Sequence, residues 1–339
     1  MYVLALRGAY GVVWKAMDKK TLTVVALKKC FDAFQNRTDA QRTYREIMYL
    51  DALGGHDNII TVHNVLKSMN DKDIYVVTDF MESDLHAVIK AGILLDIHKQ
   101  FITYQILRAL KYIHSGQVIH RDIKPSNILL NSDCSVKICD FGLARSVSHS
   151  NAAQFPIMTD YVATRWYRAP EILLGATEYS FGVDLWAVGC LLGEMLLGRP
   201  LFPGTSTINQ LDRILEVTGY PDEEDLKVIG SQFAEPMLEC LPRKPRRSLK
   251  QMMPQAPPEA IELLSGLLQL NPSKRISVVD ALESQYVKCF KGKEDEPVLK
   301  AAITLSLDDD VKLNITDYMN RLYEEVAKKR RSRAPQAAT

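Results

Sequence analysis

Hydrophobic and polar residues follow different patterns in the two parts of the chain, and the first part has the pattern of a sheet. Runs rich in β-branched and aromatic residues are separated there by turn residues, as is typical of strands. Between the second and third run, apolar residues recur at helical spacing from Thr38 to Leu53, and Thr38 and Gln41 have the spacing of a capping box. We expect one antiparallel sheet interrupted by one helix. The predicted strands are residues 12–15, 23–28, 59–65 and 74–78.

Helical periodicity takes over from Asp84 onward. It is clearest between Phe101 and Ile113, and Gly116 follows at a position where helices commonly end. The stretch from Leu185 to Gly193 is apolar all round, which indicates a buried helix, and it is shorter than the roughly 20 residues that cross a bilayer. We therefore expect an α+β protein of two lobes, one built on the sheet and one mainly helical, with the boundary near Met81.

Composition and charge narrow the classes of protein. Of the 339 residues, 47% are hydrophobic and 24% are charged, which excludes collagen-like and wholly disordered chains. With 42 basic and 41 acidic residues the net charge is +1, so no overall field attracts nucleic acid or an anionic membrane, and we expect neither as a partner. The six cysteines form no CxxC pair, which disfavours a disulfide framework or a zinc site.

The two ends of the chain bear on its location. The first residues lack the charged and apolar regions of a secretory signal, so we expect a cytoplasmic protein. The basic run 328–333 is consistent with nuclear import, or with a solvated helix end whose cations face the negative end of the helix dipole. The nucleus is therefore a second candidate location.

Two short motifs carry most of the candidate chemistry. HRD ends at Asp122, DFG begins at Asp140, and Lys124 and Asn127 lie between them. Transfer of a phosphoryl group to a hydroxyl needs metal ions, screened phosphate charge and one oriented acceptor. Asp140 and Asn127 would bind Mg²⁺, which prefers oxygen ligands. Asp122 would orient the acceptor hydroxyl, and Lys124 would screen the transferring group.

A nucleotide-binding pattern precedes these motifs. An apolar strand carries Lys28, whose charge suits the α- and β-phosphates of a nucleotide, and Glu46 on the predicted helix is its natural ion-pair partner. Gly8 and Gly11 resemble the second half of a glycine-rich turn that covers phosphates. Leu6 stands where the first glycine of that turn is expected, so the loop departs from the pattern.

Taken together, these residues resemble the eukaryotic protein kinases from about Leu4 to Lys329. The segment 159–171 resembles the TxY activation segment of mitogen-activated protein (MAP) kinases, and the stretch 198–261 matches their insert. Within that group, residues 31–42 are most similar to the atypical extracellular-signal-regulated kinases seven and eight, the MAP kinase fifteen type. The resemblance implies a bilobed protein kinase fold. Its parts are an N-lobe at 1–81, a C-lobe with catalytic loop, activation segment and insert at 82–300, and a C-terminal helix with a basic tail at 301–339.

The resemblance also implies the cofactors, which are ATP and Mg²⁺, and the nucleotide pocket. Thr78 would be the gatekeeper, residues 79–81 the hinge, and Asp84 the contact to the ribose. The residues expected to bind the nucleotide are Gly8, Gly11, Val13, Ala26, Lys28, Thr78, Asp79, Met81, Asp84 and Leu129.

A phosphorylation switch is implied in the same way. Phosphate on Thr159 and Tyr161 would be received by arginines, whose guanidinium groups pair bidentately with phosphate. Relatives of this type often phosphorylate themselves, so no upstream kinase is required. Phospho-Thr159 would bind Arg42, Arg45, Arg121 and Arg145, and phospho-Tyr161 would bind Arg165 and Arg168.

The implied partners are protein substrates with serine or threonine before proline, because the pocket for the next residue accepts a residue without a backbone donor. Proteins with basic docking motifs would bind near Asp295 and Glu296, although Gly292 replaces one expected carboxylate. The chain is expected to be a monomer. Structural roles are implied for Asp184 and Trp186, which would anchor the catalytic loop, and for an ion pair between Arg275 and Glu171.

Two other functions remain open from the sequence. A kinase-fold scaffold that only binds partners is favoured by Leu6, whereas the presence of all the expected catalytic side chains argues against it. A small-molecule kinase would leave the segment 165–171 without a purpose, since that segment resembles part of a peptide groove.

Overall fold

The computed structural model describes residues 4–8, 11–70, 72–147, 165–176, 180–307 and 311–333. The chain forms two compact units. The first, the sheet unit, comprises Met1–Glu82, Cys139–Ala144 and Thr304–Thr339. The second, the helical unit, comprises Ser83–Ile138 and Arg145–Ile303.

The sheet unit is built on a five-stranded antiparallel sheet with the strand order β1-β2-β3-β5-β4. The four strands predicted from the sequence are present, but the third begins only at Val62. Ile59 and Ile60 precede it and are 1% and 3% exposed, so these residues are apolar because they fill the core beside the sheet. The strands are β1 (Leu4–Gly8), β2 (Gly11–Met17), β3 (Val24–Cys30), β4 (Val62–Lys67) and β5 (Ile74–Asp79).

The predicted helix of this unit is α1 (Arg37–Ala52). Its N-cap is Asn36, whose side chain accepts a hydrogen bond from the backbone N–H of Asp39 at 2.9 Å. The capping box expected at Thr38 and Gln41 is therefore wrong. Asparagine caps a helix as well as threonine does, and it lies two residues earlier, so the helix begins before the box can form.

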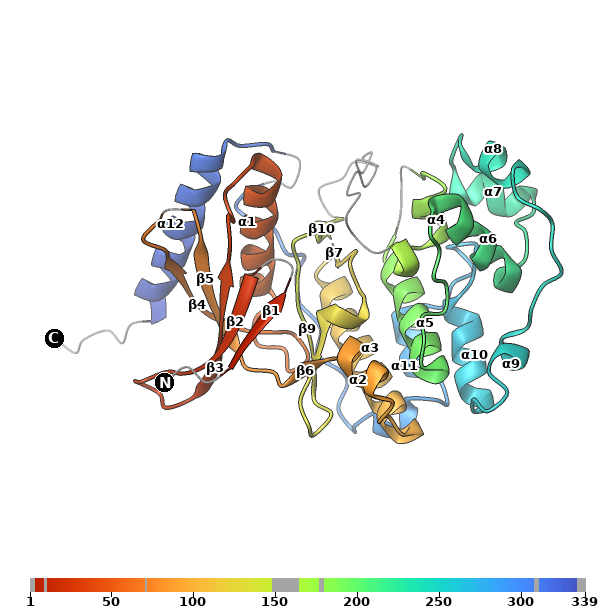
Figure 1. Cartoon of the computed structure of the whole chain (residues 1–339), viewed down its shortest axis with the longest axis horizontal. Coiled ribbons are helices and arrows are strands. Elements are labelled where there is room, and N and C mark those ends of the chain that lie inside the picture. The colour runs from red at the N-terminus through yellow and green to blue at the C-terminus, as the bar shows by residue number, and fades with distance from the viewer. Residues whose placement is uncertain are drawn as a thin grey trace. The chain divides into compact units, whose positions relative to one another are not determined.

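A second helix, α12 (Ile315–Arg333), lies beside α1 (Figure 1). The rings of Tyr44 and Tyr318 are 5.9 Å apart, and the hydroxyl of Tyr44 lies 3.0 Å from that of Ser306. Asp51 near the end of α1 pairs with Lys329. These contacts explain why the end of the chain, treated above as a separate segment, groups with the sheet unit.

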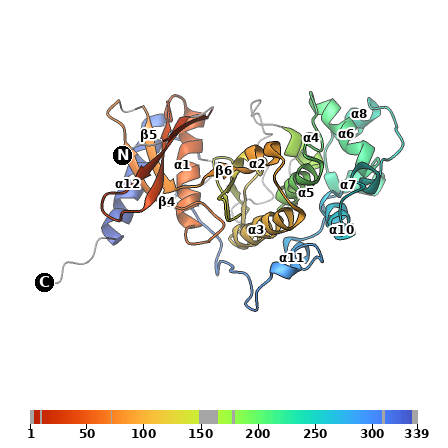
Figure 2. The same ribbon diagram turned by 60° about the horizontal axis from the view of Figure 1, so that its bottom comes forward.

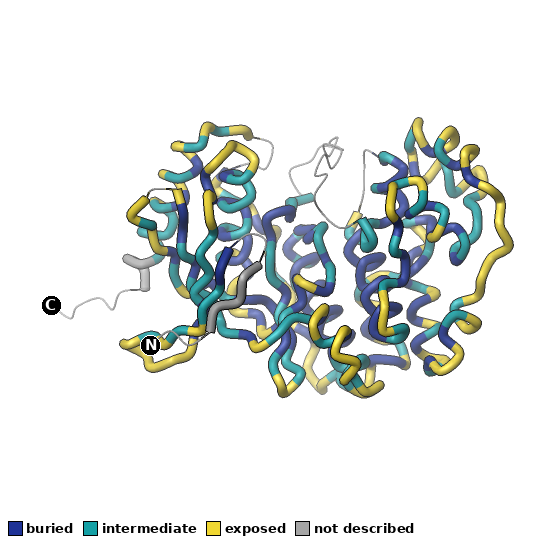
Figure 3. Tube along the Cα trace, in the orientation of Figure 1, coloured by how far each residue is buried: buried dark blue, intermediate teal, exposed yellow. Residues whose placement is uncertain are grey.

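The helical unit is centred on α5 (Gly182–Leu197) and α3 (Asp96–Ser115), which lie side by side (Figure 2). As predicted, α3 ends at Gly116 and the stretch 185–193 is a buried helix, drawn in dark blue in Figure 3. Its other helices are α2 (Leu85–Ala91), α4 (Pro170–Leu173), α6 (Thr207–Thr218), α7 (Glu223–Ile229), α8 (Ala234–Glu239), α9 (Leu249–Met252), α10 (Pro258–Leu267), α11 (Val278–Leu282) and the 3-10 helices η1 (Pro125–Asn127), η2 (Arg165–Tyr167) and η3 (Lys288–Phe290).

Short strands complete this unit. They form a three-stranded sheet of order β6-β8-β9 and a pair β10-β7. Their bounds are β6 (Ser83–Asp84), β7 (Val118–Ile119), β8 (Ile128–Leu130), β9 (Val136–Ile138) and β10 (Arg145–Ser146). An antiparallel sheet unit and a mainly helical unit confirm the expected α+β class.

Candidate active site

The sheet unit brings Lys28 and Glu46 together from β3 and α1. The Nζ atom of Lys28 lies 3.0 Å from Oε1 of Glu46, and the two side chains are 33% and 22% exposed. The Glu46 carboxylate raises the pKa of Lys28 well above its ordinary value although burial opposes this, and Asp140 adds to the rise. Lys28 is therefore a fixed cation that still reaches solvent, as a group that binds phosphate must be.

One face of the sheet gathers further predicted residues around Lys28. Val13 on β2 lies opposite Lys28, and Ala26 on β3 lies opposite Thr78 on β5. Opposite residues of antiparallel strands share a face, and so do residues two apart along a strand. These four side chains thus lie on the same face. At the end of the first hairpin Gly8 pairs with Gly11, where a Cβ atom would collide with the carbonyl of Lys29.

Asp140 belongs to the same unit although it lies far along the chain. Its backbone φ is +65°, a value that residues other than glycine rarely adopt. Its Oδ1 atom accepts a weak hydrogen bond from Gly142 N–H at 3.4 Å. Such a backbone conformation persists only where the surrounding structure maintains it.

Residues 120–127 of the helical unit, called the catalytic segment below, are organised around Asp122. Its Oδ2 atom lies 2.6 Å from Lys124 Nζ and 3.1 Å from Nδ2 of Asn127, which also donates to the Asp122 backbone carbonyl at 2.8 Å. Asn127 is held at the end of η1 and is 5% exposed. Two donors on one carboxylate oxygen fix the direction of the Asp122 side chain.

Asp184 on α5 holds the backbone of this segment, as the sequence predicted. Its two carboxylate oxygens accept from the N–H groups of His120 and Arg121 at 2.9 and 2.8 Å. Arg121 has a φ of +69°, which these bonds maintain. His114 on α3 adds a contact at 2.9 Å that sequence reasoning missed. Burial alone would raise the pKa of Asp184, but the bond to His114 and nearby positive charge lower it below its ordinary value.

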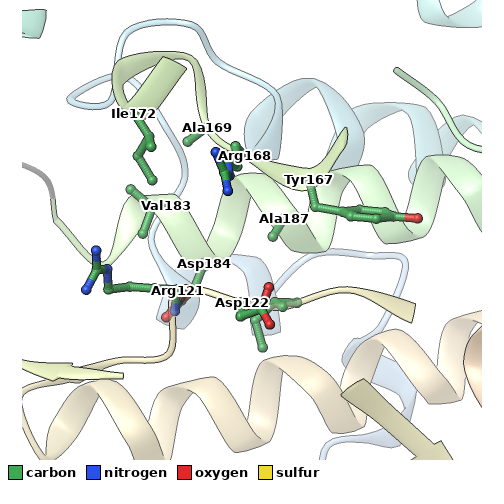
Figure 4. Close-up of a pocket in the computed structure, with 10 residues that line it drawn as sticks. Arg121, Asp122, Tyr167, Arg168, Ala169, Ile172, Val183, Asp184 and Ala187 are labelled. Atoms are coloured by element: carbon green, nitrogen blue, oxygen red, sulfur yellow. Dashed lines mark hydrogen bonds between the residues drawn. The ribbon is translucent and has the colours of Figure 1, made fainter. Parts of the chain in front are cut away.

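A small pocket lies beside Asp122 (Figure 4). Its walls come from the catalytic segment, from the residues around α4 and from α5. Tyr167 donates a hydrogen bond of 2.7 Å to Glu194 on α5, and Arg168 lines the pocket. Burial raises the pKa of Glu194 above its ordinary value, whereas the bond from Tyr167 opposes that rise. Tyr167, which lines the pocket, is therefore held by the buried carboxyl group of Glu194.

The predicted ion pair of Arg275 and Glu171 is present and buried. Two hydrogen bonds of 2.8 and 3.0 Å join them, and their side chains are 0% and 2% exposed. Trp186, expected to anchor the catalytic loop, instead lies against the Arg275 guanidinium at 5.3 Å and stacks on Phe202. Its large flat ring fits a cation better than it fits a loop backbone.

Comparison with known proteins agrees with this geometry. The protein kinase domain family matches residues 7–287. Extracellular signal-regulated kinase 2 of Dictyostelium discoideum is 58% identical over 327 residues, 96% of this chain and 89% of the relative. Mitogen-activated protein kinase 15 of Xenopus laevis is 54% identical over 96% of this chain and 56% of its own length. Extracellular signal-regulated kinase 7 of Drosophila melanogaster is 48% identical over 94% of this chain and 35% of its own length.

The chain belongs to the MAP kinase family. Members of this family are serine/threonine protein kinases that use ATP and Mg²⁺, so the predicted family, enzyme class and cofactors are confirmed. Among the described residues, no helix is both long and apolar enough to span a bilayer.

The donor set of this MAP kinase fits Mg²⁺. In the helical unit Asn127 uses its Nδ2 atom on Asp122, which leaves its side-chain oxygen, and in the sheet unit Asp140 offers a carboxylate; each is a group that the resemblance assigns to Mg²⁺. Within the described ranges, no three His, Cys, Asp or Glu side chains gather into a metal cage. Mg²⁺ usually binds through one or two carboxylates together with the phosphates of a substrate, which is the kind of site these residues offer.

Several predicted nucleotide contacts have other partners in the structure. The Asp79 carboxylate lies 3.0 Å from Thr61 N and 2.8 Å from His63 Nε2, and the Asp79 backbone N–H donates to the Thr61 carbonyl at 3.3 Å. Asp84 caps α2 by accepting from Ala87 N–H at 2.9 Å. Met81 is buried, and Leu129 pairs with Asp84 between β8 and β6. Their roles toward ATP stay predictions.

The arginines expected to receive phosphate are divided between the units. Arg42 and Arg45 lie on α1 of the sheet unit, and the others lie in the helical unit. Arg165 donates to the Thr205 carbonyl at 3.4 Å. Thr159 and Tyr161 lie outside the described residues. The helical unit's members of this set are Arg121, Arg145, Arg165 and Arg168.

The two acidic residues predicted to dock basic motifs differ in exposure. Glu296 is 5% exposed, and its carboxylate binds Lys111 at 3.1 Å and the hydroxyl of Tyr104 at 3.4 Å. Asp295 is exposed. Glu296 is therefore bound to α3, and the docking of basic motifs near these two residues stays a prediction.

Proposed function

We propose that this MAP kinase phosphorylates protein serine or threonine residues that precede proline, and that it activates itself by phosphorylating Thr159 and Tyr161. The arrangement around Asp122 carries the first part of the proposal. Its carboxylate is oriented by Lys124 and Asn127, and the backbone of the two preceding residues is held by Asp184. A scaffold that only bound partners would not need this carboxylate so fixed.

Each catalytic side chain has a task that its surroundings support. Asp122 would orient the acceptor hydroxyl and take its proton, and Lys124 would screen the charge that develops on the transferring oxygens. Lys28, held by Glu46, would bind the α- and β-phosphates. Asp140 and Asn127 would hold Mg²⁺, which would neutralise phosphate charge while ATP supplies the phosphoryl group.

The preference for proline rests on the segment that ends at Arg168. Proline has no backbone N–H, so it leaves no donor unsatisfied where the pocket offers none. Tyr167 is fixed by its bond to Glu194, and Trp166 donates to the Gly204 carbonyl at 3.0 Å. This segment is therefore rigid enough to discriminate between residues at the next position.

Activation by phosphorylation is supported by arginines that could receive the phosphate. Phosphate carries nearly two negative charges and three strong acceptors, and arginines on α1 and in the helical unit offer matching donors. Because α1 also carries Glu46, a phosphate bound by Arg42 and Arg45 would steady the partner of Lys28. Regulation would then act through order, without new chemistry.

The test is transfer of labelled phosphate from Mg-ATP to a Ser-Pro peptide and to a matched Ser-Ala peptide. We expect the wild type to prefer Ser-Pro, and Asp122→Asn to lose at least about a hundredfold in rate, since positioned acid–base groups contribute about that much. Mass spectrometry after ATP addition should find phosphate on Thr159 and Tyr161 in the wild type and not in Asp122→Asn. Equal signals from both proteins would favour the scaffold.

A further inference from the structure

A cavity of about 90 Å³ lies in the helical unit, away from the catalytic segment. Three parts of the chain form it: the connection between α5 and α6, the helix α6, and the insert segment that leads into α9. Its base is apolar and includes Leu201 and Phe202, which are 7% and 1% exposed. We call it the insert pocket. Its charged lining residues are Arg199, Arg213, Glu216 and Arg247.

The insert segment is tied to α6 by several polar contacts. Arg247 N–H donates to the Glu216 carbonyl at 2.6 Å, and the Arg246 side chain donates to the Val217 carbonyl at 2.7 Å. Lys244 lies 2.7 Å from Asp212 and 2.8 Å from Glu216. The exposed stretch 242–248, yellow in Figure 3, is therefore fixed in place, and so is the rim of the pocket.

The charges of the insert pocket are unbalanced. Its carboxylate, Glu216, is already bound by Lys244, and its distance to the Arg247 guanidinium is 4.0 Å. Arg213 uses one donor on Asn209 at 3.1 Å. Within the described part of the chain, Arg199 has no hydrogen-bond or ion-pair partner. Three arginines from separate segments thus line one cavity, and the described contacts of Arg199 and Arg213 leave donors unused.

We propose that the insert pocket binds a phosphoserine or phosphothreonine of a partner protein. A single phosphate offers three strong acceptors at one point, which suits converging arginines better than carboxylates spread along a peptide. The proposal rests on the proposed function in one respect, since the partner would be a substrate or product segment of this kinase. Binding itself requires no turnover.

The insert pocket is basic, whereas the docking site predicted from the sequence is acidic. The carboxylate of Glu296 is occupied inside the fold, whereas the insert pocket presents cations to solvent. A phosphorylated substrate held there would remain near the enzyme for a second transfer.

The test uses fluorescence anisotropy on the full chain with three labelled peptides that differ at one position. They carry phosphoserine, serine or glutamate beside a leucine. We expect the phosphoserine peptide to bind at least about tenfold more tightly than either of the others, and to weaken with salt, because charge-assisted hydrogen bonds contribute about that much. Arg199→Gln and Arg213→Gln should each weaken its binding about tenfold.

Arg243→Gln is the matched control, because Arg243 lies over the Tyr220 ring at 5.6 Å and does not line the pocket. It should bind the phosphoserine peptide like the wild type. The rate on an unphosphorylated Ser-Pro peptide should stay unchanged in Arg199→Gln, which separates this proposal from the proposed function. Equal binding of the serine peptide, or full binding by Arg199→Gln, would overturn the proposal. Equal binding of the glutamate peptide would replace phosphate by general acidity and would also overturn it.

Discussion

Each unit of the chain contains an ion pair between a basic residue and a glutamate, and the two pairs differ in exposure. In the sheet unit, Lys28 and Glu46 share one contact of 3.0 Å and are 33% and 22% exposed. In the helical unit, Arg275 and Glu171 share two hydrogen bonds and are 0% and 2% exposed. The residues were predicted to pair in both cases, but only the structure distinguishes their surroundings.

The number of other partners differs as well. Arg275 also donates to the carbonyls of Gly182 and Gln269, at 2.7 Å and 2.9 Å, so its guanidinium is fully used. Among the described residues, the ammonium group of Lys28 makes one hydrogen bond, to Glu46, so it keeps donors for a phosphate. A buried, saturated pair holds the architecture, whereas a partly exposed pair with donors left over can take part in chemistry.

The largest effect on stability is expected from breaking the buried pair. Arg275→Met would leave Glu171 charged and without its partner in the core, which typically costs about 3–5 kcal/mol of unfolding free energy. Chemical denaturation of the wild type and the variant measures this loss.

The double variant Arg275→Met with Glu171→Met removes both charges and is the control. It should recover a substantial part of the loss, because apolar residues of similar volume can replace a buried ion pair. A single variant as stable as the wild type would contradict the distinction between the two pairs.

The partly exposed pair of Lys28 and Glu46 should matter more for activity than for stability. Lys28→Met is expected to change the unfolding free energy by less than about 1 kcal/mol, as is usual for pairs that reach solvent. The rate of phosphoryl transfer should fall by roughly 10²–10³, the usual cost of removing a positioned electrostatic group. Activity and denaturation are measured on the same preparation. A loss of stability as large as that of Arg275→Met would mean that Lys28 is structural.

The sequence predicted what depends on local pattern and short motifs. Strand periodicity and the end of α3 at Gly116 are visible in the order of residues, whereas the pairing of Glu171 with Arg275 was implied only by the family resemblance. Contacts between side chains far apart in sequence could not be read this way. His114 reaches Asp184 because α3 and α5 pack together, and a histidine on an apolar helix face gives no sign of this partner.

Other errors arose where a side chain suits two different structural roles. Asn36 and Thr38 both suit a helix start, and the sequence does not rank them. As a glutamate in a charged segment, Glu296 was expected to be exposed, yet it is buried and bound by Lys111 and Tyr104. In each case packing decided between two uses of the same side chain.

Glu194 extends the comparison to a buried carboxyl group that pairs with no cation among the described residues. It is 2% exposed, and Tyr167 donates a hydrogen bond to it at 2.7 Å. Burial raises the pKa of Glu194 above its ordinary value of 4.5, and the bond from Tyr167 opposes the rise. Removing that hydroxyl should therefore raise the pKa further and shift proton uptake by the native state to higher pH.

Tyr167→Phe is accordingly expected to cost about 1.5–3 kcal/mol of unfolding free energy near neutral pH, the usual contribution of a hydrogen bond to a charged group. A carboxyl group with a raised native pKa stabilises the fold as it becomes protonated, so the deficit should shrink as the pH falls through that pKa. Denaturation of both proteins between about pH 5 and 8 measures the trend. Tyr220→Phe, which loses only an exposed bond to the Pro242 carbonyl, should show a small deficit that does not vary with pH. A deficit for Tyr167→Phe that stays constant or grows on acidification would show that the carboxyl group of Glu194 does not titrate as its burial requires.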